Sequence, residues 1–401
     1  MNRRAAYTLG VAFFFVGCSF LSFSSIAQSA PPQNPQQPAS EPEFSYAAQI
    51  PASFVHNLIF LPVQINGGKP SLFELDSTAA QTSIEPARAQ ELGLTVAGGV
   101  IQNAAMSMPG VRFGLKVLPV IARKNFAETT GQPAHGILGR DFFDHVVIVV
   151  DYLRQTVQVF DPATYKYEGQ GKPFPITGTS PSALIRAKGN AGHKSFEADF
   201  ELNTALDSAI VFYSSFTDSK QISAAHFKAI SASYPELDEG SKILVGRLKD
   251  FQIGPYAVQE PVALFSQASS PTGGSKIAGQ IGGDFLRRFS VTFDFPHQRV
   301  FLDPNLQVNH TAQEDMSGLS ILAKGANLKT FEIVQVRPGT PGADAGLKEG
   351  DVIAGIDEEA AADLSLSAIR DLFRQVGHAY KLLIERQGQS LTITVTMRRL
   401  V

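Results

Sequence analysis

Apolar and polar residues alternate along much of the chain, with turn residues between the alternating runs. Residues 58–65 and 291–295 show this period of two, which is typical of strands with one buried face. Helical patterns are few. Residues 85–92 form one, with Pro86 suited to the first turn, and residues 216–233 form a longer one. The pattern therefore predicts a mainly β protein.

Two blocks of sequence occur twice, in the same order. Residues 73–76 (Phe-Glu-Leu-Asp) recur as residues 200–203 (Phe-Glu-Leu-Asn). Residues 136–143 (Gly-Ile-Leu-Gly-Arg-Asp-Phe-Phe) recur as residues 279–286 (Gly-Gln-Ile-Gly-Gly-Asp-Phe-Leu). The alternative is a coincidence among common Gly, Asp and Phe turns. The repeat predicts two β-rich lobes, which span residues 51–165 and residues 166–308.

The N-terminus has the pattern of an export signal. Two arginines precede an apolar run over residues 5–23, and the small residues Ser25 and Ala27 suit signal-peptidase cleavage after position 27. Residues 1–27 are therefore predicted to be a signal peptide, followed by a Pro- and Gln-rich linker over residues 28–50. An exported protein, periplasmic or extracellular in a bacterium, is expected. An uncleaved segment that anchors the chain in the membrane remains the alternative.

Composition excludes several classes of site and partner. Lys and Arg number 34 against 37 Asp and Glu, so a generally cationic nucleic-acid-binding protein is excluded. The one cysteine, Cys18, lies in the predicted signal, which excludes disulfide scaffolds, thiolate zinc sites and iron–sulfur clusters within one chain. The eight histidines show no paired metal spacing, and no phosphate-binding glycine loop is present. We therefore expect no metal, cofactor or nucleic acid.

In each lobe an apolar strand leads into a short polar loop. Residues 76–79 (Asp-Ser-Thr-Ala) and 203–205 (Asn-Thr-Ala) form these loops, and the apolar segments 137–139 and 280–282, each ending in glycine, follow later. This arrangement resembles the pepsin/retropepsin superfamily of aspartic peptidases, and its downstream halves resemble the bacterial retropepsin-like branch. The resemblance implies a bilobal β-barrel body that holds a polypeptide in the cleft between its lobes.

The resemblance places the two catalytic positions at Asp76 and Asn203, and the second departs from the family's aspartate. Two close carboxylates share one proton, whereas an amide exchanges none on the catalytic timescale. Losing a positioned acid–base group costs about 10²–10⁴ in rate. The resemblance assigns support of the two loops to Ser77, Thr78, Thr204 and Ala205, of which Thr78 and Ala205 stand where the family has glycine.

Three functions follow from this departure. The first is a peptide-binding protein with a degenerate Asp/Asn pair, the second an active, slow aspartic endopeptidase, and the third a structural envelope protein; whether the chain is an enzyme is left open. Asp207 is a candidate second carboxylate, but we expect it in a loop that faces solvent. Residues 97–109 and 242–254 are candidate flaps over the cleft. Asp141 and Asp284 are expected to cap short helices.

The composition changes after Pro304, and residues 309–401 read as a separate module. A strand at residues 331–336 precedes a Pro- and Gly-rich turn, then residues 345–353 (Ala-Gly-Leu-Lys-Glu-Gly-Asp-Val-Ile), and a helix over residues 365–375 follows. This order resembles a PDZ domain, which implies an α+β module that binds a peptide or protein C-terminus as an added strand.

The resemblance also implies the residues of the peptide groove. The carboxylate-binding loop corresponds to Gly318, Leu319, Ser320 and Ile321, with Ser320 in place of the second glycine of the family pattern. Ile369 and Phe373 stand four residues apart on the predicted helix. They face either the groove or the core of the module.

Overall fold

The computed structural model describes residues 43–44, 48–177, 183–222, 227–233, 242–271, 274–309 and 314–401. The predicted signal peptide and most of the predicted linker lie outside these residues. Within the described ranges, no helix is both long and apolar enough to cross a membrane.

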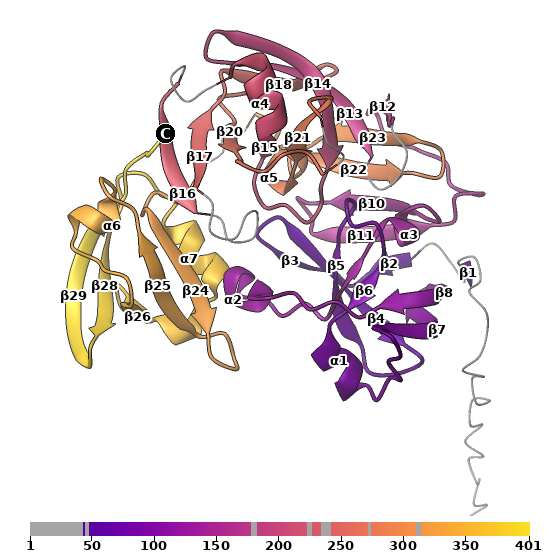
Figure 1. Cartoon of the computed structure of the whole chain (residues 1–401), viewed down its shortest axis with the longest axis horizontal. Coiled ribbons are helices and arrows are strands. Elements are labelled where there is room, and N and C mark those ends of the chain that lie inside the picture. Colours follow the sequence, from indigo (N-terminus) through magenta and orange to yellow (C-terminus); the bar gives the residue numbers. More distant parts are fainter. Residues whose placement is uncertain are drawn as a thin grey trace, which may run out of the picture. The chain divides into compact units, whose positions relative to one another are not determined.

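Lobe 1 is built on a sheet with the strand order β1-β8-β7-β4-β5-β9-β6, and β3 pairs with β4 (Figure 1). Helix α1 confirms the helix predicted at residues 85–92 and starts with Pro86, as expected. The elements of this lobe are β1 (Glu43–Phe44), β3 (Ser53–Val55), β4 (Leu58–Ile65), β5 (Ser71–Leu75), β6 (Ser83–Ile84), α1 (Pro86–Glu91), β7 (Val100–Met108), β8 (Val111–Pro119), α2 (Phe126–Thr130), β9 (Gly136–Leu138) and α3 (Arg140–Phe143).

Lobe 2 is built on a sheet with the order β16-β17-β20-β15-β21-β14-β13-β18-β19. The elements are β13 (Leu184–Ala191), β14 (Lys194–Leu202), β15 (Ile210–Phe212), α4 (Ser214–Lys220), β16 (Ala229–Ser233), β17 (Lys242–Arg247), β18 (Asp250–Ile253), β19 (Tyr256–Gln259), β20 (Val262–Phe265), β21 (Ile277–Ile281) and α5 (Gly283–Leu286).

The two lobes repeat one topology around their polar loops. In lobe 1, β5 pairs in parallel with β9, and β6 pairs antiparallel with β9. In lobe 2, β14 pairs in parallel with β21, and β15 pairs antiparallel with β21. The duplicated sequence blocks thus form the same strand arrangement twice, and each polar loop directly follows β5 or β14.

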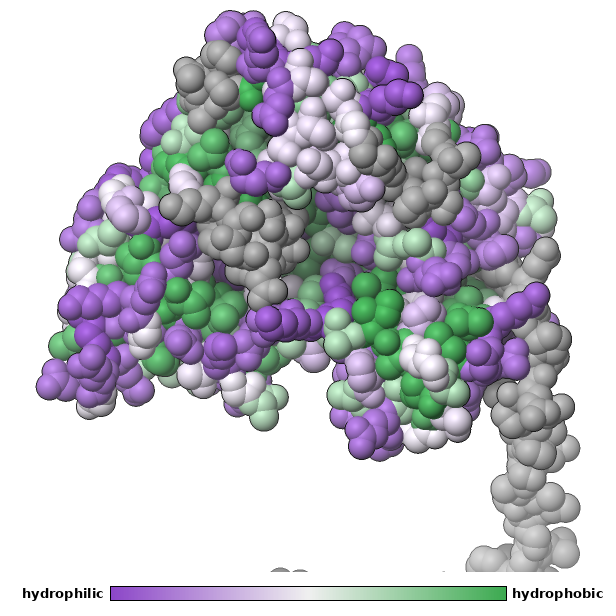
Figure 2. Space-filling model, viewed as in Figure 1, coloured by the Kyte–Doolittle hydropathy of each residue, from purple (hydrophilic) through white to green (hydrophobic). Residues whose placement is uncertain are grey.

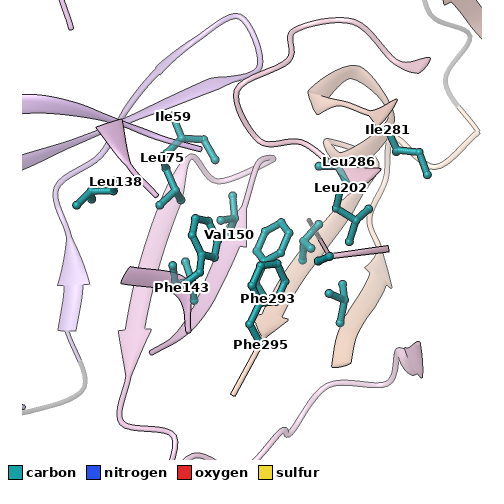
Figure 3. Close-up of a cluster of buried hydrophobic side chains, with 14 of the residues drawn as sticks. Ile59, Leu75, Leu138, Phe143, Val150, Leu202, Ile281, Leu286, Phe293 and Phe295 are labelled. Carbon is teal, nitrogen blue, oxygen red and sulfur yellow. The ribbon is translucent and has the colours of Figure 1, made fainter. Parts of the chain in front are cut away.

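A third sheet joins the lobes, with the order β12-β23-β22-β10-β11-β2. Its central contact is the antiparallel pair β10–β22, in which Val150 lies opposite Val291. Side chains from both lobes pack beneath it in one cluster, among them Phe143 of lobe 1 and Phe293 of lobe 2 (Figure 3). The strands are β2 (Ala48–Ile50), β10 (Val147–Asp151), β11 (Thr156–Phe160), β12 (Lys172–Pro175), β22 (Phe289–Asp294) and β23 (Arg299–Pro304).

The C-terminal module has its own hydrophobic core and a sheet with the order β24-β25-β26-β28-β29, with β27 paired to β26. Ser365 caps helix α7 by accepting a hydrogen bond from the Ala368 amide, which fixes the start of the predicted helix. The elements are β24 (Leu319–Lys324), β25 (Thr330–Val336), α6 (Pro341–Asp344), β26 (Val352–Ile356), β27 (Glu359–Ala360), the 3₁₀ helix η2 (Ala361–Asp363), α7 (Leu366–Leu372), β28 (Ala379–Arg386) and β29 (Gln389–Thr396).

The helix predicted over residues 216–233 is wrong in its second half. Helix α4 ends at Lys220, and residues 229–233 form strand β16, which pairs antiparallel with β17. The side chain of Ile230 packs against a small apolar cluster of lobe 2, so tertiary pairing overrides the local helical pattern.

Hydrophilic and hydrophobic residues are mixed over the face of the molecule drawn in Figure 2. Hydrophobic residues make up 44% of the sequence.

Candidate functional site

The polar loops after β5 and β14 bind each other through reciprocal hydrogen bonds. The Ser77 amide donates to Thr204 Oγ1 (3.0 Å), and the Thr204 amide donates to Ser77 Oγ (3.1 Å). Each hydroxyl then donates to a carbonyl of the other lobe, Ser77 Oγ to Leu202 O (2.6 Å) and Thr204 Oγ1 to Leu75 O (2.5 Å). Both side chains are fully buried. Four hydrogen bonds therefore fix the positions of Asp76 and Asn203, the residues that precede them.

The carboxylate of Asp76 is held by its own loop. Its Oδ1 accepts from the Thr78 amide (2.8 Å), the Thr78 hydroxyl (2.7 Å) and the Ala79 amide (3.1 Å). The Thr78 hydroxyl thus contributes a donor that a glycine at this position would lack. The partners of this carboxylate within the described ranges all belong to lobe 1.

Asn203 is fixed by a chain of hydrogen bonds within lobe 2. Its Oδ1 accepts from the Ala205 amide (2.8 Å), and its Nδ2 donates to Gln280 Oε1 (3.1 Å). Gln280 Nε2 donates to Glu201 Oε2 (3.1 Å), which also accepts from the Tyr213 hydroxyl (2.6 Å). Because a backbone amide only donates, this chain sets which end of the Asn203 amide is oxygen.

Asp76 and Asn203 line the same cavity, which measures about 610 Å³. Neither candidate flap contributes to its walls. The walls come instead from residues 123–126 and 129–130 of lobe 1 and from residues around 266–271 of lobe 2. Other residues of the wall include His56, Asn57, Asp207, Tyr213, Gln280, Asp284, Glu314, Arg370 and Arg374.

Asp207 lies in the cavity wall and is half-buried, whereas we expect it from the sequence to face solvent. Its Oδ1 accepts from Asn57 Nδ2 (2.6 Å), and its Oδ2 lies 4.0 Å from Arg374 Nη2. Burial alone would raise the pKa of Asp207, but the charges of His56, Arg374 and Arg370 lower it below its ordinary value. The carboxylate therefore lies beside Arg374 and accepts a hydrogen bond from Asn57.

Glu74 is a buried acid near Asp76 in the chain, and the sequence does not single it out as a functional residue. It is fully buried on β5, two residues before Asp76, and its Oε2 lies 2.6 Å from Arg123 Nη2. Burial raises the pKa of Glu74 to about 7, the Asp76 charge adds to this rise, and the Arg123 charge opposes it. Arg123 also stacks on the Phe126 ring, with 3.5 Å from its Cζ to the ring centroid. The sequence signals are an acid within an apolar strand and its repetition as Glu201 in the second block.

The sequence predicts Asp141 and Asp284 as helix caps, and this prediction is wrong. Gly139 and Gly282 precede α3 and α5, and no side chain caps either helix. The Asp141 carboxylate instead accepts from the Thr82 amide (2.8 Å) and hydroxyl (2.6 Å), which ties the segment after the Asp76 loop to α3. Asp284 pairs with Arg287 (2.8 Å).

The predicted groove residues of the C-terminal module have mixed surroundings. The Leu319 amide of the predicted carboxylate loop donates to Ser317 Oγ (3.1 Å), and Ser320 Oγ donates to Gln335 Oε1 (3.2 Å). Ile369 and Phe373 are fully buried in the module's own core, where Ile321 also packs. Their assignment to peptide binding stays a prediction.

The positive φ of Gly318 has a clear role. Its φ is +75°, and an added Cβ would lie 2.1 Å from Thr340 Oγ1. Only glycine fits this turn before β24.

Within the described residues, no three His, Cys, Asp or Glu side chains are placed to hold a metal ion.

Comparison with known proteins identifies the C-terminal module. The family model of the PDZ domain matches residues 332–386. This region of the chain is a PDZ domain. No curated protein matches the chain.

Solved structures align with part of the chain. An aspartic proteinase from Irpex lacteus aligns with 66% of this chain and 99% of its own length, at 14% identity and a TM-score of 0.46. The photosystem II D1 C-terminal processing protease aligns with 21% of this chain and 23% of its own length, at 28% identity and a TM-score of 0.20. The chain thus spans about a quarter of that protease.

Proposed function

We propose that the protein is an exported, aspartic-peptidase-like peptide-binding protein whose catalytic pair is degenerate. An extended polypeptide binds in the cavity between the lobes, next to Asp76 and Asn203. The PDZ domain binds a second peptide or a protein C-terminus. The N-terminal segment directs export to the periplasm or the medium and anchors the protein in a membrane if it is not cleaved.

The observation that carries this proposal is the contrast between the two loops. The Ser77–Thr204 hydrogen bonds hold the two loops against each other, which supports a paired site at Asp76 and Asn203. Asn203, however, is committed to Gln280 and Ala205 through both ends of its amide. The second N–H of its Nδ2 can orient a bound carbonyl or water. An amide supplies no proton on the catalytic timescale, so peptides bind without efficient cleavage.

The test measures binding and cleavage on the same protein. The purified chain is incubated with a proteome-derived peptide library between pH 3 and 8; bound peptides are captured, and new termini are detected by mass spectrometry. We expect retention of extended peptides without turnover. The variant Asp76→Ala should change which peptides are retained, because one wall group of the cavity is lost.

Gain of function tests the cause of the missing turnover. Asn203→Asp restores the second carboxylate, and its combination with Thr78→Gly and Ala205→Gly restores the family pattern. We expect cleavage to appear in the triple variant at about 10²–10⁴ times the background of the natural chain. Cleavage by the natural chain that disappears in Asp76→Ala would instead establish an active aspartic endopeptidase and contradict the degenerate pair.

A further inference from the structure

The PDZ domain has a sheet edge suited to an added strand. In the described structure β24 is the end strand of its sheet and pairs only with β25. Helix α7 packs beside it. A PDZ domain binds its peptide as an extra strand between such an edge and such a helix. Whatever lies between β24 and α7 therefore occupies the peptide groove.

Helix α2 of lobe 1 contacts both sides of this groove. Glu128 Oε2 of α2 lies 2.6 Å from Lys324 Nζ at the end of β24. Arg370 Nη2, on α7, donates to Thr129 O of α2 (2.9 Å) and to Ile321 O of β24 (3.4 Å). An incoming strand needs the backbone groups of β24, and here Arg370 already binds one of them.

The end of α2 is fitted closely against α7. Gly131 follows the helix with a φ of +69°, and a Cβ added to it would lie 2.8 Å from Leu366 Cβ. Leu366 is the first residue of α7. The backbone of lobe 1 therefore touches the helix wall of the groove, while Glu128 contacts the strand wall.

The same segment of lobe 1 is also a wall of the interlobe cavity. Arg123, Phe126, Thr129 and Thr130 line it, and Arg370 lines it from the PDZ side. Arg123 further holds the buried Glu74, two residues before Asp76. Movement of α2 out of the groove would thus shift a wall of the cavity that contains Asp76.

We propose that α2 is an internal occupant of the PDZ groove, and that a peptide strand on β24 displaces it and opens the cavity. The effect on the cavity rests on the proposed peptide-binding function, whereas occupation of the groove does not. Linkage makes the effect reciprocal: a cavity ligand that contacts α2 in its present place weakens peptide binding at the groove.

The first test locks α2 in place. In a Cys18→Ser background, Glu128→Cys and Lys324→Cys are joined by a short bis-maleimide. Binding is measured by fluorescence polarisation, with fluorescein-labelled heptapeptides that have free carboxyl termini and Ala, Val, Leu or Phe at the last and third-last positions. We expect the cross-linked protein to bind the best peptide at least about tenfold more weakly than the unlinked pair. Lys324→Cys capped with a monofunctional maleimide controls for the bulk of the reagent.

The second test releases α2. Glu128→Lys places two cations side by side, and we expect about threefold or greater tightening of peptide binding. Glu91→Lys, which breaks the exposed ion pair with Arg88 on α1, is the matched control and should change nothing. Equal binding by locked and unlocked protein, or no tightening in Glu128→Lys, would overturn the inference and leave the proposed function standing. Peptide retention in the interlobe cavity is measured in a separate assay. If the natural chain retains no peptide there, the proposed function is wrong, whatever the result at the groove.

Discussion

At the scale of single residues, the meeting of the lobes depends on two hydroxyl groups. Ser77 and Thr204 are both fully buried, and each satisfies an amide and a carbonyl of the other lobe. Buried polar groups that lose a partner cost about 1–3 kcal/mol each. The loops are therefore strongly coupled, although neither hydroxyl touches the space where a ligand would bind.

Thr204→Val keeps the shape of the side chain and removes its hydroxyl. The Ser77 amide and the Leu75 carbonyl then lose their partner, so the free energy of unfolding should fall by about 2–4 kcal/mol. Urea unfolding measures the change. Thr392→Val on the exposed face of β29 is the control and should stay within about 0.5 kcal/mol of the natural chain. An equally small effect at Thr204 would contradict the role given to its hydroxyl.

Glu74 gives the protein a pH dependence of known sign. Its pKa is raised from 4.5 to about 7 in the folded state, chiefly by burial. The folded state therefore binds more protons than the unfolded state between these pH values, and stability falls as pH rises through this range. Between these pH values Glu74 lowers the free energy of unfolding by about 3 kcal/mol.

The variant Glu74→Gln isolates this contribution. The loss of stability between pH 4.5 and 7.5, followed by urea unfolding, should be smaller in Glu74→Gln than in the natural chain. Glu314, whose pKa is also raised to about 7, keeps its own share of the slope in both proteins. Glu91→Gln on α1 is the exposed control. A slope that is the same in Glu74→Gln and the natural chain would exclude a raised pKa at Glu74.

At the scale of elements, strong local signals predict structure well. Pro86 stands in the first turn of α1 as the sequence predicts, and α7 lies within the helix predicted over residues 365–375. The repeat predicts that Asp76 and Asn203 follow equivalent strands, which the structure confirms. The link from Asn203 through Gln280 to Glu201 joins residues almost eighty positions apart, which meet only because β14 and β21 pair in parallel. No local pattern reveals such a contact.

Helix α3 braces the segment that follows the Asp76 loop. Asp141→Ala removes the acceptor of the Thr82 amide and hydroxyl, and Thr82 Oγ1 itself accepts from the Gly139 amide (3.1 Å). We expect a loss of about 1–3 kcal/mol in the free energy of unfolding, together with weaker peptide retention. Asp144→Ala, which breaks an exposed pair with Arg140 on the same helix, should cost less than about 1 kcal/mol. Equal effects of the two variants would show that the hydrogen bonds between Thr82 and Asp141 do not stabilise this segment.

At the scale of the whole molecule, the lobes share a sheet and the PDZ domain keeps its own core. Strands β10 and β22 pair across the lobes, and the Phe143 and Phe293 rings meet edge to face with 5.8 Å between centroids. The PDZ side chains form a separate cluster. The two lobes should therefore unfold together, and the PDZ domain should respond independently to damage in its core.

Hydrogen exchange tests this division. Phe293→Ala should lower the free energy of unfolding by about 3–5 kcal/mol and speed amide exchange in β10 as much as in β22. Phe331→Ala, in the PDZ core, should speed exchange in β24, β25 and β26 without changing β10. Faster exchange confined to lobe 2 in Phe293→Ala would show that the lobes open separately.

The shared sheet also has a consequence for the synthesis of the chain. Strand β10 is made early, and its partner β22 begins only at Phe289. At the usual pace of translation, the stretch from Asp151 to Phe289 takes on the order of ten seconds to make. During that time the apolar strand has an unpaired edge, which is a template for pairing with neighbouring nascent chains. The newly made protein is thus most prone to aggregation while lobe 2 is still being synthesised, and a holding chaperone would act in that interval.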